Sequence, residues 1–432
     1  MDIRDRLEKI ESLKRKVQQI NVTQQQKRTF STIGNGKASI SEIVPGNTIT
    51  TPHGPCFFTE KIISPDTPFG EYFLTDLLNY FPSGIHFWLP QLRRTNGDMK
   101  LEEILFFDTE TTGLAGGSGT YIFLLGLGYF SGENFYVRQY FMSDYHEEEA
   151  LLWAVNQLFG QGFKLLISYN GKSYDFPLLQ TRYIMSRLPM QLNTSYHFDL
   201  LFPTRRLWKK RLQDCSLQNI ERQILNIRRS GDIPGYLIPQ VYFRYLMDKD
   251  ARPLKPVFYH NQQDIVSLVL LTTKIGQILE DPIQNGRSAL DLCSIGKIYE
   301  GLKDFRFSSK CYEEALKCDL SDEESLETLK LCSLAYKRQG EWEKAEAAWH
   351  DIISFSSQFM LYPFEELAKY YEHRRKDYLK AQSIVEEALS KLSKAYMSTK
   401  TKEEWRDSLN YRLERIKKKQ GLTESEQSEQ KE

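Results

Sequence analysis

Two acidic residues, Asp108 and Glu110, lie one residue apart in FFDTETTGL, and the first of them ends the apolar run LEEILFFD (101–108). Alternation along a β-strand directs both carboxylates to the same face of a sheet. Two such groups repel each other unless one is protonated or a cation bridges them. Oxygen ligands suit Mg²⁺ or Mn²⁺. A lone Asp-x-Glu pair would be assigned to a solvated strand end, but the surrounding FFDTETTGL favours a metal site.

Two further acids follow in motifs of their own. Asp175 ends NGKSYD, which begins at Asn170 directly after the apolar run KLLIS. Asp264 ends YHNQQD and precedes IVSLVLLTTKIGQIL (265–279), whose apolar residues predict a helix. The sequence thus offers four carboxylates, two at a strand end, one after a second strand and one at a helix start.

FDTETTGL, NGKSYD and YHNQQD, in this order, resemble the three motifs of the DEDD 3′–5′ exonucleases. That group includes the proofreading subunits of DNA polymerases and several exoribonucleases. The resemblance covers about residues 100–280. Within the ribonuclease H-like superfamily, the chain is most similar to the bacterial YprB-type proteins, which join such a domain to helical repeats.

The resemblance implies metal-assisted phosphodiester hydrolysis with two Mg²⁺ or Mn²⁺ ions, ~3.5–4 Å apart. Asp108 is expected to bridge both ions, as the first Asp of the family does. Glu110 and Asp264 would hold the ion that activates water, and Asp175 would act on the second ion. Asn170 is expected to contact the nucleic acid rather than a metal.

The general base has two candidates. The family places a His five residues before the last Asp, or a Tyr four before it, whereas here Tyr259 is at the fifth position and His260 at the fourth. A spacing of four puts His260 on the same helix face as Asp264, and imidazole titrates near neutral pH. His260 is therefore favoured as a catalytic residue, with Tyr259 as the alternative.

Basic residues gather between 203 and 229, where eight Lys and Arg residues face two acids, an excess of six positive charges. The whole chain is neutral, with 57 Lys plus Arg and 57 Asp plus Glu, so this excess is local. It favours a phosphate-facing surface over a merely solvated helix face. The residues expected to bind nucleic acid are Arg205, Arg206, Lys209, Lys210 and Arg211.

The elements that must position these residues alternate between strand and helix. Apolar runs predict strands at 101–108, 120–130, 134–142 and 164–170, and helical spacing predicts helices at 147–159 and 265–279. Three antiparallel strands, then a helix and another strand, is the order of a ribonuclease H-like sheet. We therefore expect an α/β fold with a mixed central sheet flanked by helices.

After Pro282 the pattern becomes purely helical and repeats itself. Tyr299, Tyr336 and Tyr371 recur at intervals of 37 and 35 residues, and each begins a similar unit. The units resemble tetratricopeptide repeats, helix–turn–helix units of about 34 residues. An all-α repeat domain of this kind implies a protein partner.

The chain is expected to divide into five segments. They are an N-terminal helix and linker at 1–40, a strand and loop region at 41–99, the exonuclease domain at 100–281, the repeats at 285–418 and a disordered tail at 419–432. The six cysteines contain no C-x-x-C pair, and no apolar stretch reaches the ~20 residues of a membrane helix. We expect a cytoplasmic protein without a membrane anchor.

The predicted function is a metal-dependent 3′–5′ exonuclease acting on single-stranded nucleic acid. The alternative is a nucleic-acid-binding scaffold with a weak or inactive nuclease fold and partner-binding repeats. A complete set of mutually repelling carboxylates favours the enzyme. The sequence leaves open RNA or DNA, exonuclease or endonuclease, the partner of the repeats and the oligomeric state.

Overall fold

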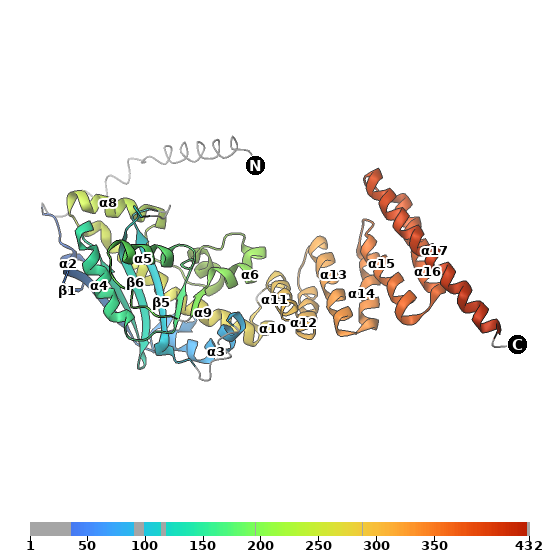
Figure 1. Ribbon diagram of the computed structural model, residues 1–432, viewed down its shortest axis with the longest axis horizontal. Helices are drawn as coiled ribbons and strands as arrows, with labels where there is room; N and C mark the ends of the chain where they lie inside the picture. Colours follow the sequence, from blue (N-terminus) through green and yellow to red (C-terminus); the bar gives the residue numbers. More distant parts are fainter. Residues whose placement is uncertain (1–35, 90–98, 114–117, 195, 287, 430–432) are drawn as a thin grey trace.

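The computed structural model describes residues 36–89, 99–113, 118–194, 196–286 and 288–429. The predicted N-terminal helix and most of its linker lie outside these residues. The described chain forms a sheet with helices on both faces, followed by a row of helices that extends away from it (Figure 1). The predicted fold class is therefore confirmed.

The sheet has seven strands in the order β1-β2-β7-β6-β5-β8-β9. β5, β6 and β7 are antiparallel neighbours, and β8 and β9 continue the sheet parallel to β5. The strand bounds are Asn47–Thr51 (β1), Gly54–Ile63 (β2), Ile104–Thr111 (β5), Ile122–Ser131 (β6), Asn134–Phe141 (β7), Leu165–Ser168 (β8) and Tyr196–Asp199 (β9). The remaining strands, β3 (Pro68–Phe69) and β4 (Tyr72–Phe73), form a separate short hairpin.

Two strands differ from expectation. β1 and β2 were expected in a region leading into the main domain, but β2 pairs with β7 and extends the same sheet. This pairing satisfies the backbone groups that β7 would otherwise leave unpaired at an edge. At the other edge of the sheet, β9 pairs with β8, and the next helix begins at Leu201.

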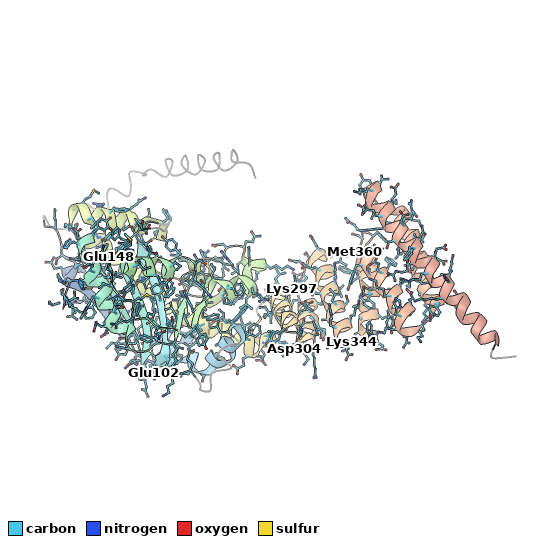
Figure 2. The ribbon with its side chains drawn as sticks, in the orientation of Figure 1. Glu102, Glu148, Lys297, Asp304, Lys344 and Met360 are labelled. Carbon is cyan, nitrogen blue, oxygen red and sulfur yellow. The ribbon has the colours of Figure 1, made fainter. Side chains whose placement is uncertain are left out.

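Helices cover the two faces of the sheet. α4 (Glu148–Phe159), α5 (Asp175–Met185) and α8 (Ile238–Asp248) share one apolar core with Leu105 and Phe107 of β5. α3 (Leu77–Trp88), α6 (Leu201–Leu212) and the long α9 (Lys255–Glu280) share the other with Ile104 and Phe106. Glu148, labelled in Figure 2, accepts a hydrogen bond from Arg182 of α5 (2.6 Å), which ties α5 to α4.

Two glycines of β6 allow α9 to lie close to the sheet. A Cβ at Gly126 would come within 2.2 Å of the Asn261 side chain, and one at Gly128 within 2.5 Å of Ile265. Gly126 pairs with Asp108 in the register of β5 and β6. Because a side chain at Gly126 would push α9 away, glycine here brings the α9 residues next to Asp108.

The C-terminal helices pack one against the next. They are α10 (Pro282–Asn285), α11 (Ala289–Gly301), α12 (Phe305–Leu316), α13 (Asp322–Gln339), α14 (Trp342–Phe355), α15 (Leu361–Tyr370), α16 (Tyr378–Lys394) and α17 (Thr399–Glu429). Small residues occupy similar positions near the start of α12, α14 and α16, and all three are fully buried: Ser308, Ala345 and Ala381. The tail was expected to be disordered from 419, but α17 continues to Glu429, since this stretch is rich in the helix formers Glu and Gln.

Helix α6 joins the sheet region to these helices. Arg211 makes two hydrogen bonds to the buried Asp291 of α11 (2.8 and 2.9 Å). Lys210 pairs with Glu327 of α13 (2.8 Å), and Lys297 of α11, labelled in Figure 2, pairs with the same carboxylate (2.9 Å). These ion pairs fix the first helices of the row against α6.

Across the residues that the structure describes, no helix has both the length and the apolar character needed to cross a membrane.

Candidate active site

Asp108 and Glu110 occupy the C-terminal half of β5, on the face that α9 covers. The alternation predicted from the sequence is present: Phe106 packs in the core that contains most of the buried residues of α9, whereas Phe107 packs in the core on the opposite face of the sheet. Burial, together with the charges of Asp264 and Asp175, raises the pKa of Asp108 well above its usual range. Burial and the charge of Asp108 raise the pKa of Glu110 likewise. The surroundings of the pair therefore disfavour the ionised form of both carboxyl groups.

Asp175 is the first residue of α5 and accepts a hydrogen bond from the Thr109 hydroxyl of β5. Burial is the largest of the effects that raise its pKa, to about 6. Thr109 lies between the two acids of the first motif, so β5 positions Asp175 directly. The second motif therefore meets the first at this strand end, as the sequence predicts.

The loop that precedes Asp175 is held by Asp199, at the end of β9. Asp199 accepts backbone N–H bonds from Asn170 (2.8 Å), Lys172 (3.1 Å) and Leu201 (3.0 Å). Asn170 has a φ of 64°, the left-handed region that Asn tolerates better than most residues. Asn170 thus has a conformational role in the turn, and its exposed side chain remains free to face a ligand.

Asp264 and His260 lie one turn apart near the start of α9. The Nε2 atom of His260 is 3.6 Å from Asp264, and its Nδ1 atom is 2.9 Å from Asp232. Burial alone would lower the pKa of His260, but the hydrogen bond to Asp232 and the charge of Asp264 outweigh it, so that the pKa is raised. Asp232 is a partner that the sequence did not reveal.

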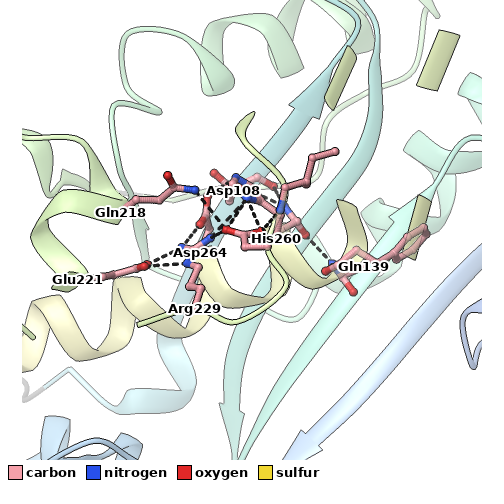
Figure 3. Close-up of polar contacts among 11 residues, drawn as sticks. Asp108, Gln139, Gln218, Glu221, Arg229, His260 and Asp264 are labelled. Atoms are coloured by element: carbon pink, nitrogen blue, oxygen red, sulfur yellow. Dashed lines mark hydrogen bonds and ion pairs between the residues drawn. The ribbon is translucent and has the colours of Figure 1, made fainter. Parts of the chain in front are cut away.

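Arg229 is a further partner that the sequence did not reveal, and it pairs with Asp264. Its guanidinium pairs with Asp264 and also with Glu221 and Asp232, as the dashed lines of Figure 3 show in part. The sequence placed Arg229 among phosphate-facing residues, yet its side chain is only 6 % exposed. A basic residue in a charged run gives no sign of burial, and the pairing with Asp264 joins segments that lie 35 residues apart.

Asn261 links Asp108 to a chain of buried amides. Its Nδ2 atom donates to Asp108 (2.8 Å), and its Oδ1 atom accepts from Gln139 of β7 (2.8 Å). Gln139 also donates to the carbonyl of Phe258 (2.9 Å) and accepts from Thr59 of β2 (3.2 Å). The bond from Gln139 fixes the orientation of the Asn261 amide, so that its N–H groups point to Asp108.

The predicted basic residues separate into two groups. Arg205 and Lys209 line a cleft of about 490 Å³ together with Asn170. Arg206 instead lies over the Trp88 ring (5.5 Å), and Lys210 and Arg211 form the ion pairs with Glu327 and Asp291 described above. Helix α6 therefore turns one side to the cleft and the other to the C-terminal helices.

The donor chemistry of the site fits a hard divalent cation, since buried carboxylates with raised pKa values gain from one. Among the described residues, however, no three His, Cys, Asp or Glu side chains stand in an arrangement that could hold a metal ion. Asp264 faces the guanidinium of Arg229 instead. The carboxylates thus act on one another electrostatically, and one of them is neutralised from within the protein.

Comparison with known proteins agrees with this fold. Residues 105–276 match the model of the RNase H superfamily, so this part of the chain is an RNase H-like domain. The chain is 35 % identical over 319 residues to "Uncharacterized protein YprB" of Bacillus subtilis (strain 168). The match covers 73 % of this chain and 75 % of that relative. The chain therefore belongs to the same family as that protein.

Proposed function

We propose that this chain is a metal-dependent nuclease that hydrolyses single-stranded nucleic acid from its 3′ end. The observation that carries the proposal is the meeting of Asp108, Glu110, Asp175 and Asp264, from three separate motifs, at one end of β5. The pKa values of Asp108, Glu110 and Asp175 are each raised in part by the charge of at least one other acid of this set. Such a cluster is costly unless cations neutralise it, and two Mg²⁺ or Mn²⁺ ions would do so.

Each side chain has a distinct task in this proposal. Asp108 is central, because Asn261 fixes its orientation and the other acids surround it. Glu110 and Asp264 would hold the ion that activates water, and Asp175 would act on the second ion. A bound divalent ion would supply a more acidic water and would neutralise charge at the phosphate.

The proton of the attacking water would pass to His260. Because Asp232 holds Nδ1, the Nε2 atom is the one directed toward Asp264 and the acid cluster. A carboxylate behind an imidazole fixes its tautomer and stabilises the protonated form that follows proton transfer. Tyr259 is the alternative base. His260→Ala should lower turnover by about 10²–10⁴-fold and Tyr259→Phe should not.

The nucleic acid would enter through the cleft lined by Asn170, Arg205 and Lys209. Two cations on one wall suit a single-stranded phosphate backbone. Arg206, Lys210 and Arg211 are occupied elsewhere in this structure, so the proposal assigns them a smaller share of binding. The C-terminal helices are proposed as tetratricopeptide-like repeats that bind a protein partner.

One observation favours a second candidate, a scaffold that binds nucleic acid without cutting it. Arg229 neutralises Asp264, and a site closed in this way has less need of a metal ion. Cleavage assays separate the two functions. Purified chain is incubated with 3′- and 5′-labelled single-stranded RNA and DNA, with Mg²⁺ or Mn²⁺.

The enzyme predicts metal-dependent shortening from the 3′ end, lost in Asp108→Ala. The matched control is Asp66→Ala, which removes an exposed aspartate from the same domain and should cut normally. If the unmodified chain bound the nucleic acid without cleaving it, the result would favour the scaffold function. Equal cleavage by Asp108→Ala would refute the proposed metal site, and internal fragments would indicate an endonuclease.

A further inference from the structure

Arg229 is a buried cation in a set of three carboxylates. Its Nε atom is 2.7 Å from Glu221, its Nη1 atom is 3.0 Å from Asp232, and its Nη2 atom contacts Asp264. The exposed fractions of the four side chains are 6 % for Arg229 and 2, 11 and 15 % for Glu221, Asp232 and Asp264. Such a set is little screened by solvent, so each contact has a substantial energetic effect.

The three acids around Arg229 come from different parts of the sequence. Asp264 belongs to the metal-site motifs, whereas Glu221 and Asp232 lie in a segment that contains none of them. One oxygen of Asp264 receives the guanidinium, and the other is 3.6 Å from Nε2 of His260. Both oxygens of Asp264 are therefore directed to basic side chains, and a metal ion bound there would lie beside the positive charge of Arg229.

We propose that Arg229 competes with a divalent ion for Asp264, and that ion binding leaves the guanidinium on Glu221 and Asp232 alone. The inference rests on the proposed function and adds a residue that regulates the affinity of the site for a divalent ion. The two remaining carboxylates make the exchange feasible, because the released guanidinium stays paired and is never buried alone.

The same contacts predict a specific energetic consequence. The Arg229–Asp264 contact must break when an ion binds to Asp264. The free energy of that contact therefore reduces the net free energy of ion binding, and the ion binds more weakly. Among the described residues, neither Asp108 nor Glu110 forms an ion pair of this kind, which agrees with their raised pKa values. The ion that depends on Asp264 should therefore bind more weakly than an ion held by the other carboxylates.

The test is a titration of the full chain with Mn²⁺, without nucleic acid, in which free Mn²⁺ is followed by electron paramagnetic resonance. Arg229→Gln should lower the dissociation constant by about tenfold, or add a second bound ion. Arg228→Gln removes the same charge from the neighbouring exposed residue and should leave binding unchanged. If Arg229 had a merely structural role, its removal would weaken Mn²⁺ binding. Tighter Mn²⁺ binding in Arg229→Gln therefore supports the inference, and weaker binding contradicts it.

Arg229→Gln leaves Glu221 and Asp232 buried without their partner, and the variant could fail to fold. The double variant Glu221→Gln with Arg229→Gln removes one charge of each sign and should also bind Mn²⁺ more tightly. Glu221→Gln alone should have the opposite effect, since Arg229 then depends more on Asp264. If the unmodified chain binds Mn²⁺ and both Arg229 variants bind it equally or more weakly, only this inference fails. If none of the proteins binds Mn²⁺, the proposed function fails too.

Discussion

Asn261 donates a hydrogen bond to Asp108 over 2.8 Å, and this amide is itself held by Gln139. The contact joins α9 to β5 at the acid that the proposed mechanism places between both ions. Asn261 is fully buried, so its amide has no water to exchange with. The position of Asp108 is thus set by a residue three positions before Asp264 on the same helix.

Asn261→Ala should lower metal affinity or turnover by about 10–100-fold, the usual effect of removing a partner that orients a ligand. The variant leaves Asp108 without this hydrogen bond and Gln139 with only the Phe258 carbonyl as an acceptor. Mn²⁺ titration and cleavage rates measure the two effects separately. Asn156→Ala, which removes another buried amide bonded only to Pro189 and Gln191, is the control. Equal losses in both variants would show that Asn261 contributes only to stability.

Gly126→Ala should both destabilise the protein and impair the site. The added Cβ would lie 2.2 Å from the Asn261 side chain, so α9 or the amide must move. Overpacking of this kind typically costs about 1–3 kcal/mol. Urea unfolding and cleavage rates measure both effects. Gly421→Ala, which meets open space on α17, should change neither. Normal activity in Gly126→Ala would contradict the close approach of α9 to β6.

Asp108→Asn should stabilise the metal-free protein while abolishing cleavage. The substitution removes one of the mutually repelling charges and keeps the size of the side chain. Thermal unfolding should therefore occur at a higher temperature in the variant without metal. Mn²⁺ should raise the unfolding temperature of the unmodified chain, because an ion that binds only the folded state stabilises it. A melting point that Mn²⁺ leaves unchanged in the unmodified chain would count against the metal site.

Glu372 should make the stability of the C-terminal helices depend on pH. The side chain is buried and pairs with Arg412, Arg415 and Lys419 of α17. Burial opposes its ionisation, but the hydrogen bonds from Arg415 and Lys419 lower its pKa from 4.5 to about 2. Because folding lowers this pKa, ionised Glu372 stabilises the folded state at pH values above its pKa in the unfolded state. This stabilisation is lost as the pH falls from 4.5 toward 2.

The measurement is urea unfolding of the unmodified chain and of Glu372→Gln between pH 2 and 7. At pH 7 the variant should be less stable by on the order of 3 kcal/mol, since three cations lose their partner. The difference should shrink below pH 4.5. Glu386→Gln on α16 removes an exposed carboxylate and serves as the control. A difference that stays constant with pH would show that the effect is one of packing.

The sequence predicted those parts of the site that depend on local pattern. Strand alternation placed Asp108 and Glu110 on one face, and the helical spacing of four placed His260 beside Asp264. Asn261, Asp232 and Arg229 escaped prediction because their roles depend on contacts between distant segments. A signal for Asn261 existed in hindsight: Gly126 and Gly128 alternate on one strand, which indicates a close neighbour on that face.

In the sheet, too, local features were predicted from the sequence and long-range pairing was not. The antiparallel β5, β6 and β7 followed from apolar runs and a short turn, whereas the pairing of β2 with β7 is set by tertiary contacts that join residues about 80 positions apart. Likewise, the positive charge of α6 was evident from composition. Which of its cations face the cleft and which are neutralised by Glu327 and Asp291 depends on where the C-terminal helices pack.

Helix α6 makes the two halves of the molecule interdependent. Arg205 and Lys209 line the cleft, while Lys210 and Arg211, on the same three turns, hold the first C-terminal helices. A helix this short moves as a unit, so a displacement of the helices reaches the cleft wall. We therefore expect reciprocal linkage: a partner that shifts the helices changes affinity for nucleic acid by the same factor by which nucleic acid changes affinity for the partner.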